Sequence, residues 1–342
     1  MFIIFSIRGG FIISKPTIKS IAKDLDLSSS TVSKALSGQP EINSDTRIRI
    51  LNHANEVGYM KNPNGRRRFG ILVVKTSTAN SINPLMLDLI MSFRDYAGKL
   101  GYDVIMLSAD KSSQEEETFD HYISANQLDG VFISGLETTD TYYVQLKDTV
   151  VPVVLMDMFA DSPLAGSVGT DSILGGELAV SHLVKNGHRR IGFVNGHKEA
   201  YISKERLAGY ITGIQNHDID YDPHLYYVGD FSSESGARAA DYFAKTDATA
   251  VYFASDLMAH GAVKRFLEIG YTLPVDMSIV GFDNMPIGQG CIPSITTIAQ
   301  NPVSLGENAC ALLCGIIQKS PIRRVSLGPY LIERESVAKR EG

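Results

Sequence analysis

The chain has 342 residues, of which 44% are hydrophobic and 20% are charged, and its formal net charge is −6. A chain of this length can bury the cores of two or three domains, and its ordinary composition excludes disordered, collagen-like and coiled-coil proteins. No apolar run reaches the roughly 18 residues that would cross a bilayer, so we expect no membrane segment. The three cysteines are too few for a disulfide framework, and we expect them to be reduced in a cytoplasmic protein.

The charge is distributed unevenly along the chain. Residues 1–68 contain eleven basic and five acidic residues, a net charge of +6, whereas the remainder contains 21 basic and 33 acidic residues, a net charge of −12. A small basic segment joined to a large acidic body is the asymmetry expected of a nucleic-acid-binding module attached to a second functional unit. Chance fluctuation in a short segment is the alternative, so charge alone leaves both interpretations open.

Residues 1–14, with the sequence MFIIFSIRGGFIIS, are apolar but are interrupted by Arg8, Gly9 and Gly10. A secretory signal would carry basic residues before an unbroken apolar core and small residues at a cleavage site, and this segment has neither. We therefore expect an N-terminal extension that belongs to no domain.

Residues 15–59 show the pattern of three short helices. Thr17 can cap a first helix whose apolar positions repeat every three or four residues, and this pattern breaks near Asp26. Ser28 can cap a second helix, and a third begins near Ser44. The residues that we expect the third helix to bury are Ile48, Leu51, Ala54 and Val57. Two short helices around a tight turn, braced by a third, predict a helix-turn-helix bundle.

The second helix would present a hydroxyl-rich face that ends in a lysine. Its exposed positions are Ser29, Ser30, Thr31, Ser33 and Lys34. Hydroxyl groups and a lysine near the start of a helix are suited to contact base edges and phosphates in a major groove. Serines also act as simple helix caps and solvated surface residues, which is the interpretation that we favour for Ser28.

A short basic linker, MKNPNGRRRF at 60–69, follows the bundle. Pro63 and Gly65 oppose a helix in this linker. The linker residues that we expect to contact DNA are Arg66, Arg67 and Arg68. Arginines can enter a narrow minor groove or lie against phosphates. The alternative is a solvated linker that adds only non-specific attraction.

From residue 70 onward, short apolar runs alternate with helical patterns. The strand-like runs are GILVV (70–74), YDVIMLS (102–108), GVFIS (130–134), VPVVLMD (151–157), RIGFVNG (190–196), LYYVGD (225–230), AVYFAS (250–255) and MSIVGFD (277–283). Regular alternation of strands and helices predicts an α/β fold with doubly wound parallel sheets. A break near 166–171 divides this pattern into two lobes.

Polar side chains stand at the ends of these strands, where ligands bind in doubly wound sheets. The residues concerned include Ser77, Asp110, Asp157, Asn195, Asp230, Phe231, Asp256 and Asp283. Carboxylates and amides beside an aromatic ring predict a pocket for a polyol, because they accept its hydroxyl groups while the ring packs against its apolar face. An aspartate at a strand end is also a common helix cap, so each one keeps that alternative.

The head carries the pattern T-I-K-x-I-A-K…L-S-x-x-T-V-S-K-A-L-S-G…I-N-x-x-T-R-x-x-I between Thr17 and Tyr59. This pattern resembles the N-terminal head of the lactose-repressor (LacI/GalR) family of bacterial transcription factors. The resemblance implies two sets of DNA contacts. Those on base edges would come from Ser29, Ser30 and Lys34, and those near phosphates from Thr17, Thr31 and Ser33.

Two features depart from that family pattern. The family's linker is typically longer and forms a hinge helix that inserts a leucine into the minor groove, whereas the ten linker residues here contain no leucine. We therefore expect no leucine insertion. Asp26 stands in the turn where the family usually has glycine, and aspartate tolerates the left-handed conformation better than most residues.

Motifs of the body resemble the effector-binding core of the same family. They are DSILGGELAVSHLVKNGHRRIGFVNG, ERLAGY, GDFSSESG, SIVGFDN, TTIAQN and LIERES. The resemblance implies that Arg206 and Asp283 pair on ligand hydroxyl groups and that Phe231 stacks on the ligand. Further contacts would come from Asp157, Asp171, Asn195 and Asp256.

The core of that family has two lobes joined by three crossovers. The resemblance places the crossovers near Val168, Ile295–Ala299 and Val325–Leu327. The expected domains are an extension (1–14), the head (15–59), the linker (60–69), an N-terminal lobe (70–167 with 299–325) and a C-terminal lobe (168–298 with 326–342). The helix at 303–318 would contribute part of its apolar face to a dimer interface.

The leading functional hypothesis is a homodimeric transcriptional repressor that binds a pseudo-palindromic operator in double-stranded DNA and is controlled by a small-molecule effector. We expect the effector to be a sugar or a sugar derivative. A free sugar-binding protein serving a transporter would share the body, but it would carry a secretory signal and no head. An enzyme is the third class, and the chain has no P-loop, G-x-G-x-x-G, H-E-x-x-H or G-x-S-x-G motif. We therefore expect no catalysis, no cofactor and no metal.

Overall fold

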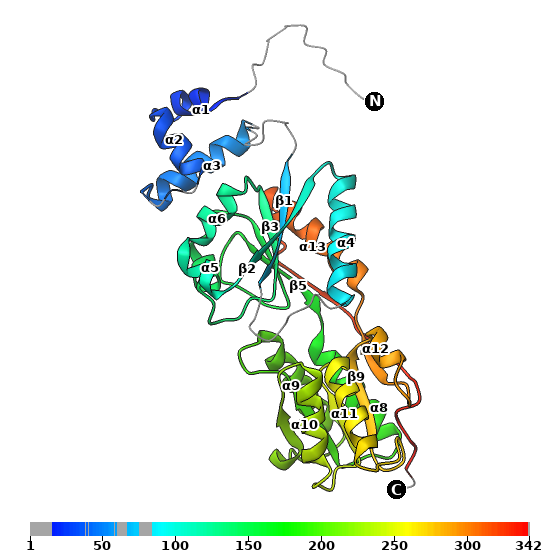
Figure 1. The fold of residues 1–342 in the computed structure, drawn as a ribbon. Helices are drawn as coiled ribbons and strands as arrows, with labels where there is room; N and C mark the ends of the chain where they lie inside the picture. Colours follow the sequence, from blue (N-terminus) through cyan, green and yellow to red (C-terminus); the bar gives the residue numbers. More distant parts are fainter. Residues whose placement is uncertain are drawn as a thin grey trace, which may run out of the picture.

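The computed structural model of the chain describes residues 16–37, 39, 41–57, 59, 67–74 and 84–340. A small helical head lies beside the first of two larger lobes, which follow one another along the molecule (Figure 1). The expected extension, most of the expected linker and Ser77 lie outside the described residues. Within the described ranges, no helix is long and apolar enough to cross a membrane.

The head is the predicted helix-turn-helix bundle. Its helices are α1 (Ile18–Asp24), α2 (Ser29–Leu36) and α3 (Ser44–Glu56). Thr17 and Ser28 cap α1 and α2 as predicted, because each hydroxyl oxygen accepts a backbone N–H in the first turn of its helix. Asp26 occupies the turn with φ of 55°, the left-handed conformation that a tight turn requires.

The predicted buried face of α3 is partly wrong. Ile48 is 45% exposed and Val57 is also exposed, whereas Ile50 and Ala54 are buried in the core of the head. The helix is rotated because the Arg47 side chain turns inward and donates to the carbonyl groups of Gln39 and Ile42. Positions 47, 50 and 54 are spaced by three and four residues and the predicted positions by three, and both spacings are helical, so periodicity alone could not distinguish the two.

The N-terminal lobe is built around a parallel sheet with the strand order β11-β5-β4-β3-β1-β2. Its elements are β1 (Arg68–Val74), α4 (Pro84–Lys99), β2 (Asp103–Ala109), α5 (Lys111–Glu116), α6 (Phe119–Ala125), β3 (Gly130–Ser134), α7 (Thr141–Gln145), β4 (Val153–Met156), β5 (Ala165–Thr170), α13 (Pro302–Ile317) and β11 (Arg324–Leu327). Helices α4 and α13 form one apolar cluster with the sheet, and α6 and α7 form another. Both faces of the sheet are therefore covered.

The C-terminal lobe has a second sheet, with the strand order β12-β10-β9-β8-β6-β7. Its elements are α8 (Ser172–Lys185), β6 (Ile191–Asn195), α9 (Tyr201–Gln215), β7 (Tyr226–Val228), α10 (Ser233–Phe243), β8 (Ala250–Phe253), α11 (Asp256–Glu268), β9 (Ser278–Asp283), α12 (Pro286–Gln289), β10 (Thr296–Ala299) and β12 (Tyr330–Ile332). Only β12, paired with β10, is antiparallel among these described strands. The α/β fold with two doubly wound sheets is confirmed.

Four strands in the described part of the chain were not among the eight predicted, namely β5, β10, β11 and β12. Strand β5 reads AGSVGT and β10 reads TTIA, so neither has the run of large apolar residues that marks a buried strand. Strands β11 and β12 lie at sheet edges and are three or four residues long. These four segments are strands because they pair with neighbouring strands, and their own residues give no strand signal.

The chain passes between the lobes after β5, β10 and β11. The predicted crossover positions, Val168, Ile295–Ala299 and Val325–Leu327, lie mainly inside these strands and are therefore a few residues too early. For the same reason, the elements of the N-terminal lobe span 68–170 and 302–327 rather than 70–167 and 299–325. The error follows from treating short strands as connections.

Candidate nucleic-acid interface and ligand site

The outer face of α2 presents the residues predicted to contact DNA. Ser29, Ser30, Ser33 and Lys34 are all exposed, and their spacing places them on one face of the helix. Thr31 is half-buried, and its hydroxyl lies 2.8 Å from the Ser28 hydroxyl. Thr17 is exposed, and its hydroxyl oxygen accepts the Ser20 N–H at 3.1 Å.

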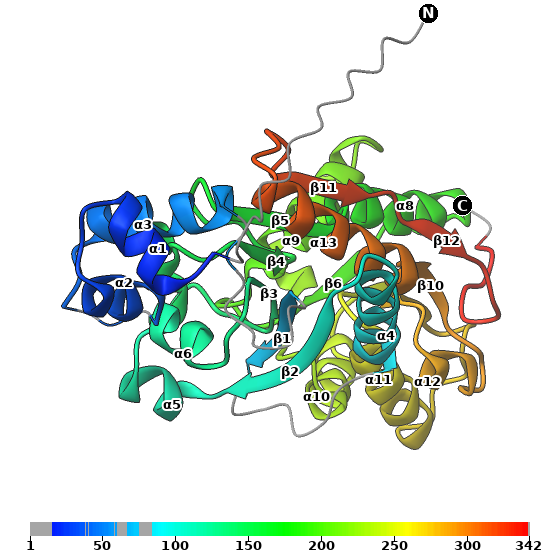
Figure 2. The ribbon, with the colours of Figure 1, turned by 90° about the horizontal axis from the view of Figure 1, so that it is seen from above.

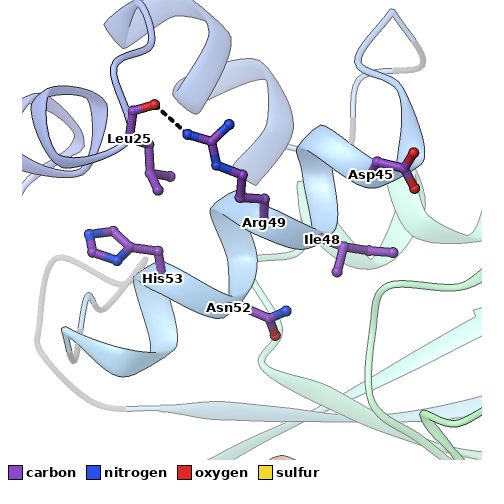
Figure 3. A pocket seen from close by; sticks show the side chains of 6 residues that line it. All are labelled: Leu25, Asp45, Ile48, Arg49, Asn52 and His53. Carbon is purple, nitrogen blue, oxygen red and sulfur yellow. Dashed lines mark hydrogen bonds between the residues drawn. The ribbon is translucent and has the colours of Figure 1, made fainter.

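Helix α3 holds the turn that orients α2. Leu25 lies at the end of α1, and its carbonyl accepts a hydrogen bond from the Arg49 side chain at 2.6 Å (Figure 3). His53 Nε2 lies 3.1 Å from Asp24 Oδ2. These two contacts line a shallow groove on the head and connect α3 to the segment that enters the helix turn. The position of α2 is thus supported by polar contacts as well as by the small apolar core.

Of the predicted arginine cluster, the structure describes Arg67 and Arg68. Arg66 lies outside the described residues. Arg68 is the first residue of β1, and its N–H donates to Asp129 Oδ2 at 2.7 Å. The Arg67 carbonyl accepts from the Asp103 N–H at 3.0 Å. The backbone of Arg67 and Arg68 is therefore fixed to the N-terminal lobe, and the linker ends earlier than expected.

The C-terminal lobe carries a buried arginine and a carboxylate at the edge that faces the N-terminal lobe. Arg206 of α9 is 5% exposed, and its Nη2 lies 3.3 Å from Asp283 Oδ1 at the end of β9. The Arg206 guanidinium also donates to the Ala254 carbonyl and lies 4.1 Å from the centroid of the Phe282 ring. A buried arginine with an ion pair and an aromatic neighbour is held in one orientation.

Asp283 is connected to the crossovers between the lobes. Its Oδ1 accepts from Gln300 Nε2 at 2.7 Å, and Gln300 Oε1 accepts from the Thr170 hydroxyl at 2.7 Å. Gln300 follows β10 and Thr170 ends β5, so both stand where the chain passes between lobes. Burial raises the pKa of Asp283, an effect that the charge of Arg206 opposes. Sequence reasoning missed Gln300 and Thr170.

Phe231 forms an aromatic wall of the same site. It lies in the loop between β7 and α10 with φ of 66°, and its ring packs over Gly196 so closely that a Cβ there would lie 1.9 Å from the ring. The ring centroid is 5.6 Å from that of His197, in an edge-to-face arrangement. The Arg206 guanidinium carbon is 5.8 Å from the Phe231 centroid. Phe231, Arg206 and Asp283 are therefore neighbours, as the sequence predicts.

Asp157 reaches the site from the opposite lobe. It follows β4 with φ of 53°, and its buried Oδ1 has no hydrogen-bond partner among the described residues. Burial raises the pKa of Asp157 to about 7. A narrow cavity beside it is lined by Glu205 and Tyr201 of the C-terminal lobe and by Arg324 of the N-terminal lobe. An unpaired buried carboxylate oxygen is costly unless a ligand supplies a donor.

Three predicted ligand residues make bonds within the protein instead. Asp171 caps α8 by accepting the Leu174 N–H at 3.0 Å. The Asn195 side chain donates to the Ser203 carbonyl at 3.0 Å and accepts the Gly196 N–H at 2.9 Å. These contacts support the loops that carry the ligand site.

Asp256, the third of these residues, holds the loop after β9. It accepts the Met285 N–H and the Thr297 hydroxyl, each at 2.6 Å. Burial raises its pKa to about 7. The side chain thereby positions the segment that contains Asp283.

Two arginines at the cleft, Arg206 and Arg324, are paired with carboxylates. Arg206 pairs with Asp283, and Arg324 pairs with Glu205 across the lobes at 3.1 Å. At the other side, Lys111 lies 3.8 Å from Glu137, which is also 4.0 Å from the His197 ring of the opposite lobe. The sequence did not predict the pairing of Glu205 with Arg324, because the two residues are 119 positions apart in the chain.

Comparison with known proteins finds a family model described as a periplasmic binding protein-like domain, which matches residues 180–337. The HTH-type transcriptional repressor CytR of Escherichia coli strain K12 is 31% identical over 327 residues, covering 94% of this chain and 95% of its own. The HTH-type transcriptional repressor PurR of Aliivibrio salmonicida is 28% identical, covering 94% of this chain and 99% of its own. The solved structure of a transcriptional regulator CelR-cellobiose complex is 26% identical with a TM-score of 0.72, covering 94% of this chain and all of that one.

Proposed function

The chain belongs to the LacI/GalR family of bacterial transcriptional regulators, and we propose that it represses transcription by binding a pseudo-palindromic operator as a homodimer under the control of a small, uncharged, polyhydroxylated effector. The single observation that carries this proposal is the combination, in one chain, of an exposed polar α2 face with a cavity between two lobes that lies beside buried polar side chains. We place the protein in the cytoplasm, where its DNA target lies.

The DNA contacts follow from the exposure of α2. We assign Ser29, Ser30 and Lys34 to base edges, because all three side chains are exposed on the outer face of the helix, with the serines in its first turn and Lys34 in its last turn. The residues assigned to phosphates are Thr17, Thr31, Ser33, Arg66, Arg67 and Arg68. A single head of this size makes few contacts, so two heads on two half-sites are needed for useful affinity.

The effector contacts follow from the polar groups in the cleft. Asp283 and Asp157 would accept hydroxyl groups of the ligand, while Phe231 packs against its apolar face. The CelR structure is that of a complex with cellobiose, which is a ligand of this class, and it supports the proposal. The paired state of Arg206 and Arg324 argues against a phosphorylated effector, because a phosphate would have to displace a carboxylate from each. Asp171, Asn195 and Asp256 would support these contacts.

The homodimer surface that we propose runs along α4 and β2 of the N-terminal lobe. Leu87 and Met91 on α4 are 53% and 40% exposed, and Met106 on β2 is 53% exposed. Strand β2 is the edge of its sheet, and this face lies in the lobe that carries the head. Exposed apolar side chains on neighbouring elements favour protein association. A twofold axis through this surface would present two heads to one operator.

The DNA half of the proposal is tested by selecting bound sequences from random duplexes. The wild-type protein should enrich a pseudo-palindrome, and Ser29→Ala and Lys34→Ala should change the enriched bases at single positions of each half-site. Lys185→Ala, an exposed lysine on the C-terminal lobe, is the matched control and should leave the motif unchanged. Recovery of no motif, or the same motif from the α2 variants, would contradict the assignment.

The effector half is tested by calorimetric titration with matched neutral and phosphorylated sugars: cellobiose, glucose with glucose 6-phosphate, and ribose with ribose 5-phosphate. We expect binding among the neutral members and at least about tenfold weaker binding of the phosphorylated partner. Arg206→Lys should abolish binding, whereas Arg265→Lys on the surface of α11 should not. Preferential binding of a phosphorylated member would overturn the charge argument.

A further inference from the structure

The head contacts the N-terminal lobe through an ion pair between α3 and α6. Arg47 Nη1 lies 3.8 Å from Asp120 Oδ2, and the two side chains are only 11% and 14% exposed. The helices of the head lie beside α6 in both views of the fold (Figures 1 and 2). Exposed ion pairs contribute little, but a shielded pair between two domains restricts their relative orientation.

Both partners of this pair are anchored in their own domains. Arg47 also donates to the carbonyl groups of Gln39 and Ile42, in the loop that joins α2 to α3. Asp120 accepts the Thr149 hydroxyl at 2.6 Å and the Val150 N–H at 3.2 Å. The contact therefore joins two side chains that are each held by hydrogen bonds within their own domain.

The core side of the contact leads to the ligand site. Thr149 and Val150 lie in the segment before β4 (Val153–Met156), with two residues between Val150 and the strand, and β4 is a fully buried strand in the middle of the N-terminal sheet. Asp157, directly after the other end of β4, lines the cavity between the lobes and carries a buried Oδ1 without a hydrogen-bond partner among the described residues. One rigid strand thus has the ligand site at its carboxyl end and the anchor of the head contact at its amino end.

The connection between head and lobe is short. Tyr59 and Arg67 are separated by eight Cα–Cα steps, which span at most roughly 29 Å. A tether of this length keeps the head near the lobe, so a contact that would be weak between separate molecules is favoured within one chain.

We propose that the Arg47–Asp120 pair is a docking contact that fixes each DNA-binding head against its own N-terminal lobe and thereby sets the orientation of α2. The docking itself does not depend on the proposed function; its effect on operator binding does. Movement of β4 would then reorient the head without any need for a helical linker.

Asp120→Asn removes the charge and keeps the size of the side chain, and Thr149→Val removes one anchor of Asp120. We expect both variants to increase hydrogen exchange of the head segment at 39–47 by at least about threefold, with a smaller effect from Thr149→Val. Asp148→Asn, an exposed carboxylate in the same loop, is the control and should leave that exchange unchanged. Faster exchange confined to 119–125 would indicate a merely local role and would overturn the proposal.

The second measurement uses duplexes that carry two selected half-sites at different spacings. In the docked wild type, affinity should depend steeply on the spacing, because both heads have fixed orientations. Asp120→Asn should reduce the ratio of the affinities for the best and the worst spacing by at least about threefold, and it should leave the affinity for a single half-site unchanged. Spacing dependence equal to that of the wild type would contradict docking, even if the variant exchanged faster. Failure of the selection to give a motif would contradict the proposed function and leave the exchange measurement to decide the docking.

Discussion

Residues of the ligand site adopt backbone conformations that few non-glycine residues accept. Asp157, Phe231, Asp283 and Asn284 all have positive φ, between 53° and 107°. Such conformations cost on the order of 1–3 kcal/mol each and persist where the surroundings impose them. Phe231 and Asp283 place their side chains beside Arg206, and Asn284 Oδ1 accepts from Arg334 Nη2 at 2.6 Å. The backbone is thus strained where the ligand contacts are proposed.

The closest packing in the site is that of Phe231 over Gly196. Gly196→Ala should displace the ring, because a Cβ at this position would lie 1.9 Å from it. We expect the affinity for a bound neutral sugar to fall about three- to tenfold, the amount associated with one aromatic contact. Calorimetric titration measures this loss. Gly98→Ala on α4, where the added Cβ meets no atom within 4 Å, should bind as the wild type does.

Asp157 makes the stability of the protein depend on pH. Burial raises its pKa from 3.8 to about 7, so the folded state binds more protons than the unfolded state between these values. The contribution of Asp157 to the free energy of unfolding should therefore decrease as the pH rises from about 4 to about 7. Asp157→Asn should reduce this decrease by about 1 kcal/mol or more, and other carboxyl groups whose pKa burial raises, among them Asp256 and Asp283, contribute further.

Chemical denaturation across this pH range measures the effect. Asp161→Asn, an exposed carboxylate in the loop that follows Asp157, is the control and should keep the wild-type dependence. A parallel dependence in the wild type and Asp157→Asn would mean that the Asp157 carboxyl titrates normally.

At the scale of secondary structure, sequence patterns identified elements with their own chemical signals. The α1 and α2 caps and the turn at Asp26 were predictable because each depends on neighbouring residues. Strands β5 and β10 were not, because their small and polar residues become strands only when paired within a sheet. The rotation of α3 was equally hidden, since it depends on an arginine that turns inward to a loop.

The turn between α1 and α2 offers a test of that local argument. Asp26 has φ of 55°, which glycine adopts without strain. Asp26→Gly should stabilise the head by about 0.5–1 kcal/mol, and Asp26→Ala should destabilise it. Hydrogen exchange of α1 and α2 in the full chain measures both changes. Equal protection in all three proteins would show that the turn carries no strain.

The same distinction applies to the candidate site as a whole. Family resemblance identified Arg206, Asp283 and Phe231, and the fold brings these residues together. It did not reveal Gln300, whose side chain forms hydrogen bonds with Asp283 and with Thr170. Thr170 is 130 residues away from Gln300 in the sequence. It also did not show that Asp256 and Asn195 use their polar atoms within the protein. Such assignments depend on which long-range partners the fold supplies.

At the scale of the whole molecule, the apolar strip on α4 and β2 predicts association. Met91→Asp should weaken the homodimer at least about tenfold, because a charge would be buried against an apolar surface. Sedimentation at several concentrations measures the monomer fraction. Val144→Asp on α7, an apolar residue that is 56% exposed on the other side of the sheet, is the control. Identical sedimentation of Met91→Asp and the wild type would exclude this surface.

The two oxygens of Asp283 differ in their occupancy. Oδ1 accepts from both Arg206 and Gln300, which uses its two lone pairs, whereas Oδ2 accepts no hydrogen bond among the described residues. A ligand hydroxyl that donates to Oδ2 would draw electron density away from Oδ1 and weaken its bond to Gln300. Ligand binding at Oδ2 would thus weaken the hydrogen bond through which Oδ1 holds Gln300, the residue where the chain passes from β10 to the N-terminal lobe.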